Sequence, residues 1–186
     1  MTTDGVVAAP HVRTYGCASY STGVGVHRRT LQFIADEEDV TLLKLPPGLA
    51  WAVMPAIEAT DLRAPLPVTM MGVSGMAPRV SAAWALKAGA NRQDSGWPQV
   101  YTRSDLAMPE GLVWNTAGAA IGLAIAPQGH DANRAYVRML PTSAIRARLA
   151  RHGWTWPGAD GHPRDAEVAM RLALAATVPI VCERTR

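Results

Sequence analysis

Short apolar runs separated by turn residues set the pattern of hydrophobic and polar positions along this chain. A short run that alternates or is continuously apolar, and that ends at Gly, Pro or a polar cluster, is typical of a β-strand. A helix would instead repeat its apolar positions every three to four residues. The runs predict strands at residues 6–9, 19–26, 30–35, 40–45, 68–71, 79–86, 135–140 and 178–182. The pattern therefore predicts a mainly β fold.

Two helices are expected close to the C-terminus. The first spans residues 144–152, with Thr142 or Ser143 as its N-cap, because their hydroxyls can accept hydrogen bonds from unpaired first-turn amides. The second spans residues 165–176, where Ala, Arg, Met and Leu dominate. Neither region shows the short runs that predict strands elsewhere.

Composition supports a folded chain built from many turns. Of 186 residues, 48% are hydrophobic and 18% charged, which is enough to bury a core and argues against global disorder. The 16 Gly and 14 Pro suit short strands joined by tight turns. The net charge of +3 comes from scattered basic residues without interleaved aromatics, so no nucleic-acid partner is predicted.

No membrane, metal or cofactor signature is present in the sequence. The N-terminus lacks the basic and apolar regions of a signal peptide, and no apolar run reaches the length of a membrane span. As written, the sequence predicts a soluble, cytoplasmic chain, and a periplasmic or secreted one if a leader has been removed. The five histidines have no metal-ligand spacing, so neither metal nor cofactor is expected.

The two cysteines, Cys17 and Cys182, lie near opposite ends of the chain. A disulfide between them would close most of the chain, whereas a reduced pair would act as two small hydrophobic residues. The sequence leaves both alternatives open.

Four segments carry a resemblance to a known family. Residues 5–12 read Gly-Val-Val-Ala-Ala-Pro-His-Val, and residues 36–44 read Asp-Glu-Glu-Asp-Val-Thr-Leu-Leu-Lys. Further on, residues 111–115 form a strand-like run, and a turn and strand pattern follows at residues 118–123. In this order the segments resemble trypsin-like serine proteases of the bacterial Deg type. The resemblance covers about residues 6–149 and implies a trypsin-like double antiparallel β-barrel with C-terminal helices.

The resemblance assigns two of the three catalytic side chains. His11 falls on the general-base position and Asp39 on the carboxylate that orients the base. Each residue also has an ordinary explanation, because His11 can be a half-buried histidine bonded to backbone, and Asp39 a turn residue before a strand. We expect the two side chains to be neighbours.

The third catalytic side chain, the nucleophile, is missing. No Ser or Cys lies between Asp105 and Pro127, where the family carries its serine, and the nucleophile turn has shrunk to residues 109–111. Ser74 lies in a Gly-x-Ser-Gly sequence but precedes the wrong strands, so it is only a runner-up nucleophile.

The implied organisation is a truncated first barrel over residues 1–60, a second barrel and helix over residues 61–153, and a helix–strand tail over residues 154–186. The first barrel lacks an N-terminal strand, which leaves an unpaired edge. The tail strand at residues 178–182 can fill it, as can a strand from a second subunit. We expect the tail strand to be an edge strand lying near residues 6–9, with Cys182 close to Cys17.

Without its nucleophile, the chain is predicted to be a catalytically inactive, protease-like module that binds a protein or peptide. The resemblance places the peptide site at Glu110, Gly111 and Trp114. One alternative is an active serine endopeptidase that uses Ser74 or is completed by a partner subunit. Another is a structural subunit whose open first barrel is a docking edge.

Overall fold

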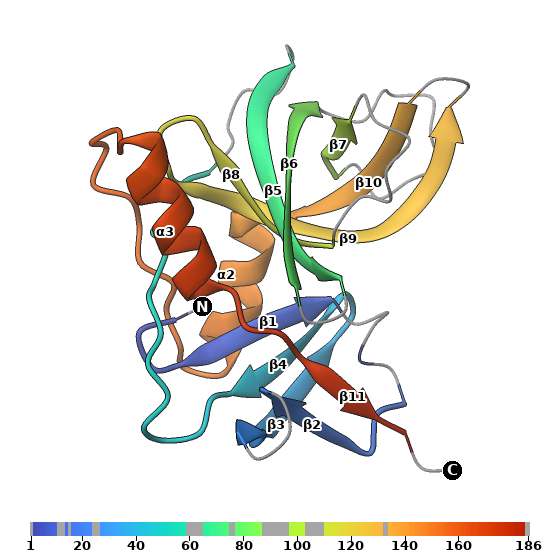
Figure 1. The fold of residues 1–186 in the computed structure, drawn as a ribbon, viewed down its shortest axis with the longest axis vertical. Coiled ribbons are helices and arrows are strands. Elements are labelled where there is room, and N and C mark those ends of the chain that lie inside the picture. The colour runs from blue at the N-terminus through green and yellow to red at the C-terminus, as the bar shows by residue number, and fades with distance from the viewer. Residues whose placement is uncertain are drawn as a thin grey trace.

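In the described part of the chain, two antiparallel sheets form the fold, and two helices pack beside them (Figure 1). The computed structural model describes residues 2–184 except 11–13, 15, 24–26, 59–64, 75–76, 87–96, 103–109 and 132–133. Within the strands, the side chains of residues 73–74, 77–78, 86, 102, 126–131 and 134–135 lie outside this description.

The first sheet is open and has five strands in the order β1-β4-β3-β2-β11. Its central strand pair is a hairpin in which Glu37 and Val40 are partners across a two-residue turn. The apolar residues of β4 are fully buried, as expected for the run that precedes Pro46. The strands are β1 (Val6–Pro10), β2 (Ser19–Thr22), β3 (Arg29–Glu37), β4 (Val40–Lys44) and β11 (Val181–Glu183).

The second sheet is a closed barrel in the order β10-β7-β6-β5-β8-β9. Its interior is filled by apolar side chains that include Met70, Val113, Val137 and Met139. The short strand β7 was not predicted, because four residues after a polar loop give too little periodicity to be recognised. The strands are β5 (Leu66–Ser74), β6 (Ala77–Leu86), β7 (Gln99–Thr102), β8 (Gly111–Asn115), β9 (Ala120–Asp131) and β10 (Arg134–Pro141).

The two sheets share one core with the helices, which lie together on one side of the molecule (Figure 1). Side chains from β1, β4, β9 and both helices meet in it. No helix in the described part of the chain combines the length and apolar character that crossing a membrane requires.

Helix α2 (Thr142–Arg151) begins earlier than predicted and without a side-chain cap. The N-cap is Pro141, so the expected cap at Thr142 or Ser143 was wrong. Strand β10 runs directly into the helix, which places Thr142 inside its first turn. The Thr142 hydroxyl instead donates to the carbonyl oxygen of Ile57, at 2.8 Å, and so ties the helix to the connection between the sheets.

Helix α3 (Ala166–Ala176) confirms the second predicted helix. The Asp165 carboxylate caps it by accepting a hydrogen bond from the Glu167 amide at 2.8 Å. Its buried residues, Ala169, Ala173 and Ala176, are small and allow the helix to lie close against the shared core.

The tail strand β11 lies at an edge of the first sheet, as predicted, but not beside residues 6–9. It pairs with β2, at the opposite end of the sheet from β1 (Figure 1). The expected position was wrong: β1 and β2 each present an edge, and the disulfide to Cys17, just before β2, holds the tail at the β2 edge. Val178 and Ile180 pack against the core of the first sheet on the way to this edge.

The proximity expected for the two cysteines is confirmed, because Cys17 and Cys182 form a disulfide across 165 residues of sequence. The choice that the sequence left open is thereby settled.

Candidate functional site

Asp39 occupies the two-residue turn between β3 and β4, and its carboxylate is directed at the second half of the molecule. The Oδ2 atom accepts a hydrogen bond from Nη2 of Arg148 at 3.0 Å, and Oδ1 lies 3.6 Å from Nη2 of Arg138. Arg148 is on α2 and Arg138 is on β10. The Asp39 side chain is only 14% exposed, so water screens these ion pairs weakly.

Both guanidinium groups also lie over the indole ring of Trp97, just before β7. The distances from the guanidinium carbon to the ring centroid are 5.0 Å for Arg138 and 5.8 Å for Arg148. These distances fall within the range of cation–π attraction. We call Asp39, Trp97, Arg138 and Arg148 the arginine cluster.

The hydrogen bonding of the arginine cluster is incomplete. The Nε atoms of Arg138 and Arg148 are buried, and neither has a hydrogen-bond partner in the described part of the chain. Arg148 donates to Asp39 and, through Nη1, to the carbonyl oxygen of Ala144 at 3.0 Å. Among the described residues, the polar contact of Arg138 is the 3.6 Å ion pair with Asp39, which is too long for a hydrogen bond.

A second ionic contact lies beside this cluster and also joins β3 to α2. The Glu37 carboxylate accepts from Nη1 of Arg151 at 2.6 Å and lies 2.9 Å from Nε2 of His152. The hydrogen bond from His152 is the main reason that the pKa of Glu37 lies below its usual value, and the charge of Arg151 adds to it. Because the His152 ring also stacks on Trp154, with centroids 5.8 Å apart, this contact is held in place.

His11 lies outside the described residues, so its distance from Asp39 stays a prediction. The residue before it, Pro10, is the Cα partner of Val40, which follows Asp39 in sequence. The backbone of β1 therefore brings the start of this segment to the end of β4 that carries Asp39.

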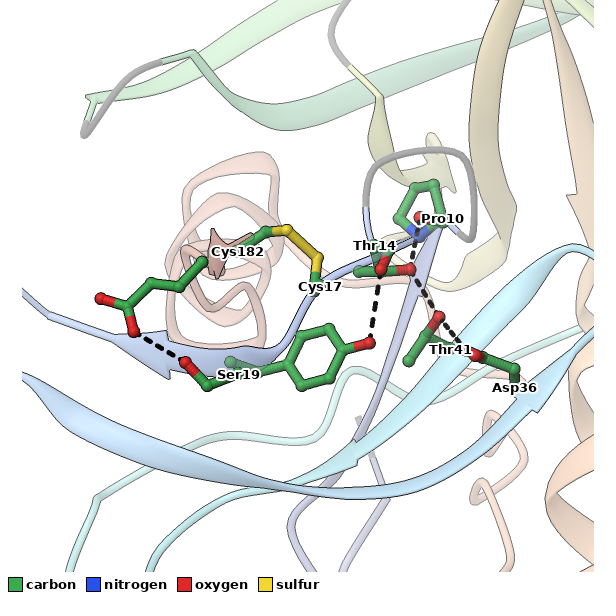
Figure 2. The surroundings of a disulfide bond; sticks show 9 residues. Pro10, Thr14, Cys17, Ser19, Asp36, Thr41 and Cys182 are labelled. Carbon is green, nitrogen blue, oxygen red and sulfur yellow. Dashed lines mark hydrogen bonds between the residues drawn. A yellow bond between two sulfur atoms is a disulfide. The ribbon is translucent and has the colours of Figure 1, made fainter. Parts of the chain in front are cut away.

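A network of hydroxyl groups fixes the chain on the other side of His11 (Figure 2). The Thr14 hydroxyl lies 3.3 Å from the Pro10 carbonyl oxygen and 2.5 Å from the Thr41 hydroxyl. The Thr41 hydroxyl in turn donates to the Asp36 carboxylate at 2.6 Å. Sequence reasoning missed this network, because single hydroxyl residues in separate strands give no pattern.

The other predicted site residues lie in the second barrel. Ser74 is the last residue of β5, with Ala77 as its Cα partner, and its side chain is outside the described part. Glu110 and Gly111 are half-buried at the start of β8, whereas Trp114 is 3% exposed and belongs to the shared core. Their role in peptide binding stays a prediction.

Comparison with solved structures identifies the architecture. The chain is similar to the Rv3671c protease in its inactive form, with 18% identity, a TM-score of 0.53 and 82% of each chain covered. It is also similar to the active form of that protease from M. tuberculosis, with 18% identity, a TM-score of 0.52, and 89% of this chain and 77% of that chain covered. The fold is a trypsin-like double β-barrel. At this identity the likeness shows the fold alone, which confirms the predicted fold class.

No protein-family model matches the sequence, and no curated protein is significantly similar to it. Within the trypsin-like fold, the motif match that pointed to Asp39 led to a residue at the junction of the two sheets. It did not lead to Trp97, Arg138 and Arg148, because isolated residues in a loop, a strand and a helix carry no spacing signal.

Proposed function

We propose that this chain is a non-catalytic protein of trypsin-like fold that binds a protein or peptide segment. The binding region would be the former substrate site, close to Glu110 and the arginine cluster. The observation that carries the proposal is the state of Asp39, the carboxylate at the triad-equivalent position, which faces two guanidinium groups.

The chemistry of a catalytic triad explains why this matters. In such a triad the carboxylate holds the imidazole in the right tautomer and stabilises the imidazolium that forms during the reaction. The charge of Asp39 is already opposed by guanidiniums at 3.0 and 3.6 Å. Two cations beside it disfavour a third, so an imidazolium at this place would gain little from the carboxylate.

The sequence supports the same proposal independently. The window between Asp105 and Pro127 holds neither Ser nor Cys, so the segment that would supply the nucleophile lacks the serine of the family and any thiol that could replace it. Loss of a triad member costs several orders of magnitude in rate, so a chain without the nucleophile of the family is expected to be inactive.

The first part of the test asks whether the protein has peptidase activity, and it also distinguishes the alternative of an endopeptidase that uses Ser74. The purified protein is incubated with a fluorogenic peptide-substrate library and, separately, with a fluorophosphonate probe that labels activated serines. We expect neither turnover nor labelling. Labelling that disappears in the Ser74→Ala variant would instead establish the alternative, a serine endopeptidase that uses Ser74. Turnover that appears only with a co-purified subunit would indicate completion by a partner.

The binding part of the test uses an array of random octapeptides probed with the labelled protein. We expect a subset of peptides to be retained, and we expect Glu110→Gln to weaken their binding. The matched control is Glu167→Gln on α3, where the side chain is 74% exposed. An array without any retained peptide would contradict the proposed function.

A further inference from the structure

The arginine cluster carries more positive charge than its surroundings balance. Arg138 and Arg148 contribute two positive charges, and Asp39 contributes one negative charge. Glu38 lies 3.7 Å from Arg148, but its side chain is 90% exposed, so water screens it strongly. The next carboxylate, Glu37, is occupied by Arg151 and His152. Counting the residues that the structure describes, about one positive charge is therefore left without a close counter-ion.

The surplus charge is concentrated on Arg138. Arg148 already donates two hydrogen bonds, to Asp39 and to Ala144. Among the described residues, Arg138 has Asp39 as its polar contact, at 3.6 Å, and its buried Nε atom has no hydrogen-bond partner. A buried donor without an acceptor costs free energy, and a guanidinium without a hydrogen-bonded counter-ion costs more. The ion pair between Asp39 and Arg148 is sufficient to join the two sheets, so holding the sheets together does not require Arg138.

The geometry favours a ligand that reaches Arg138 from outside. A quarter of the Arg138 side chain is exposed, at 26%, whereas that of Arg148 is 10% exposed. The Arg138 guanidinium carbon lies 5.0 Å from the centroid of the Trp97 ring, and this cation–π contact restricts the position of the guanidinium without supplying it with a hydrogen-bond acceptor. A guanidinium fork matches the two oxygens of a carboxylate.

We infer that Arg138, supported by Trp97 and Arg148, is a subsite for a carboxylate of the bound peptide. This rests on the proposed peptide-binding function and names the chemistry of its ligand. A carboxylate carries the single negative charge that balances the cluster, whereas a phosphate monoester carries close to two. The carboxylate can belong to an Asp or Glu side chain or to a free C-terminus, and the experiment separates these sources.

The experiment uses octapeptide arrays attached through their N-termini in three forms. The first form has free C-termini, the second has C-terminal amides, and the third has C-terminal amides and Gln or Asn in place of every Glu or Asp. The wild-type protein is expected to bind the uncharged form about tenfold less than the best carboxylate-bearing form, as expected for a lost hydrogen bond to a charged group. Loss on amidation alone identifies the C-terminus, and loss only in the third form identifies a side chain.

Arg138→Gln is expected to abolish this preference. The matched control is Arg171→Gln on α3, where the side chain is 71% exposed, and it should bind as the wild type does. Equal binding of all three forms by the wild type would overturn the carboxylate subsite and leave peptide binding intact. An array that retains no peptide in any form would instead count against the proposed function itself.

A measurement on the wild-type protein covers the case in which Arg138→Gln does not fold. The amide-type ¹H–¹⁵N signal of the Arg138 Nε–H group is followed by NMR during titration with the tightest array peptide and with its uncharged form. We expect the signal to shift with the carboxylate-bearing peptide and to stay in place with the other. A bound peptide that leaves this signal unmoved would overturn the inference.

Discussion

At the scale of single residues, the backbone conformation at position 111 and the close approach of a neighbouring strand explain why this residue is glycine. Gly111 begins β8 with φ of 152°, and a Cβ atom added there would lie 2.2 Å from the carbonyl oxygen of Met71 on the neighbouring strand. A glycine at this position therefore allows β5 and β8 to approach each other within the predicted peptide site.

Gly111→Ala should consequently destabilise the barrel. The added methyl group forces the backbone apart, with an expected loss of about 2–3 kcal/mol in the free energy of unfolding, measured by urea denaturation. The matched control is Gly48→Ala, where φ is also positive, at 78°, but no atom lies within 4 Å of the added Cβ. The control should lose about 1 kcal/mol. Equal losses would show that the contact with Met71 is relieved without cost.

Glu37 makes the free energy of unfolding depend on pH in the acidic range. Its pKa is lowered in the folded state, chiefly by the hydrogen bond from His152, so folding favours the ionised carboxylate. This stabilisation is present above the unfolded-state pKa, near 4.5, and is lost as pH falls through the lower folded-state value.

Glu37→Gln is therefore expected to cost about 1–2 kcal/mol at pH 7 and progressively less below about pH 4.5. The measurement is the free energy of urea unfolding of both proteins between pH 7 and pH 3. A difference between variant and wild type that stays constant over this interval would contradict the role assigned to the carboxylate.

At the scale of elements, the turn between β3 and β4 adds polar contacts with β10 and α2 to the apolar core that the first sheet shares with them. Asp39 joins Arg138 and Arg148 there, and Glu37 joins Arg151 and His152. The hairpin and the helix therefore behave as one packed unit, although α2 follows the barrel in sequence.

Asp39→Asn should loosen this unit without changing any reaction. Removing the carboxylate leaves two guanidiniums facing each other, and we expect a loss of about 2–4 kcal/mol in unfolding free energy. Adding Arg148→Met to this variant removes one of the unpaired charges and should recover part of the loss. A double variant less stable than the sum of the two single changes would show that the ion pair is not the source of the effect.

At the scale of the whole molecule, the C-terminal strand extends the first sheet at its β2 edge, although it comes from the far end of the chain. Strand β11 pairs with β2, Glu183 accepts from the Ser19 hydroxyl at 2.7 Å, and the disulfide joins Cys182 to Cys17 (Figure 2). Chain segments 165 residues apart are thereby held together.

The disulfide and the strand can be separated experimentally. Replacing both cysteines by Ser should lower stability by about 2–5 kcal/mol, since the cross-link restricts a long loop in the unfolded chain. Reductant should destabilise the wild type by a similar amount and leave the Ser variant unchanged. Equal stability of the oxidised and reduced wild type would contradict this expectation.

Truncation after residue 180 tests the strand itself. It removes the cross-link and also exposes the edge of β2, which becomes free to pair with another chain. We expect lower stability than in the double Ser variant and concentration-dependent self-association, detected by light scattering after size-exclusion chromatography. A monomeric truncation product as stable as the double Ser variant would show that β11 adds nothing beyond the disulfide.

The sequence by itself determined the elements that depend on neighbouring residues. The alternating run at residues 30–35 and the buried run at residues 40–45 predicted β3 and β4, and the Ala-rich segment with Asp165 predicted α3. The order of the motifs also predicted the trypsin-like fold. These signals are local, because the side-chain period of a strand or helix is repeated within a few residues.

Only the tertiary structure decided which distant groups meet. The sequence named Asp39 but not Arg148, which lies 109 residues later and becomes its partner because α2 packs against the β3–β4 turn. It also placed the tail strand at the wrong end of the first sheet, since both edges suit a short strand equally well. These contacts depend on how distant elements pack against one another, and a pattern of neighbouring residues in the sequence does not determine that packing.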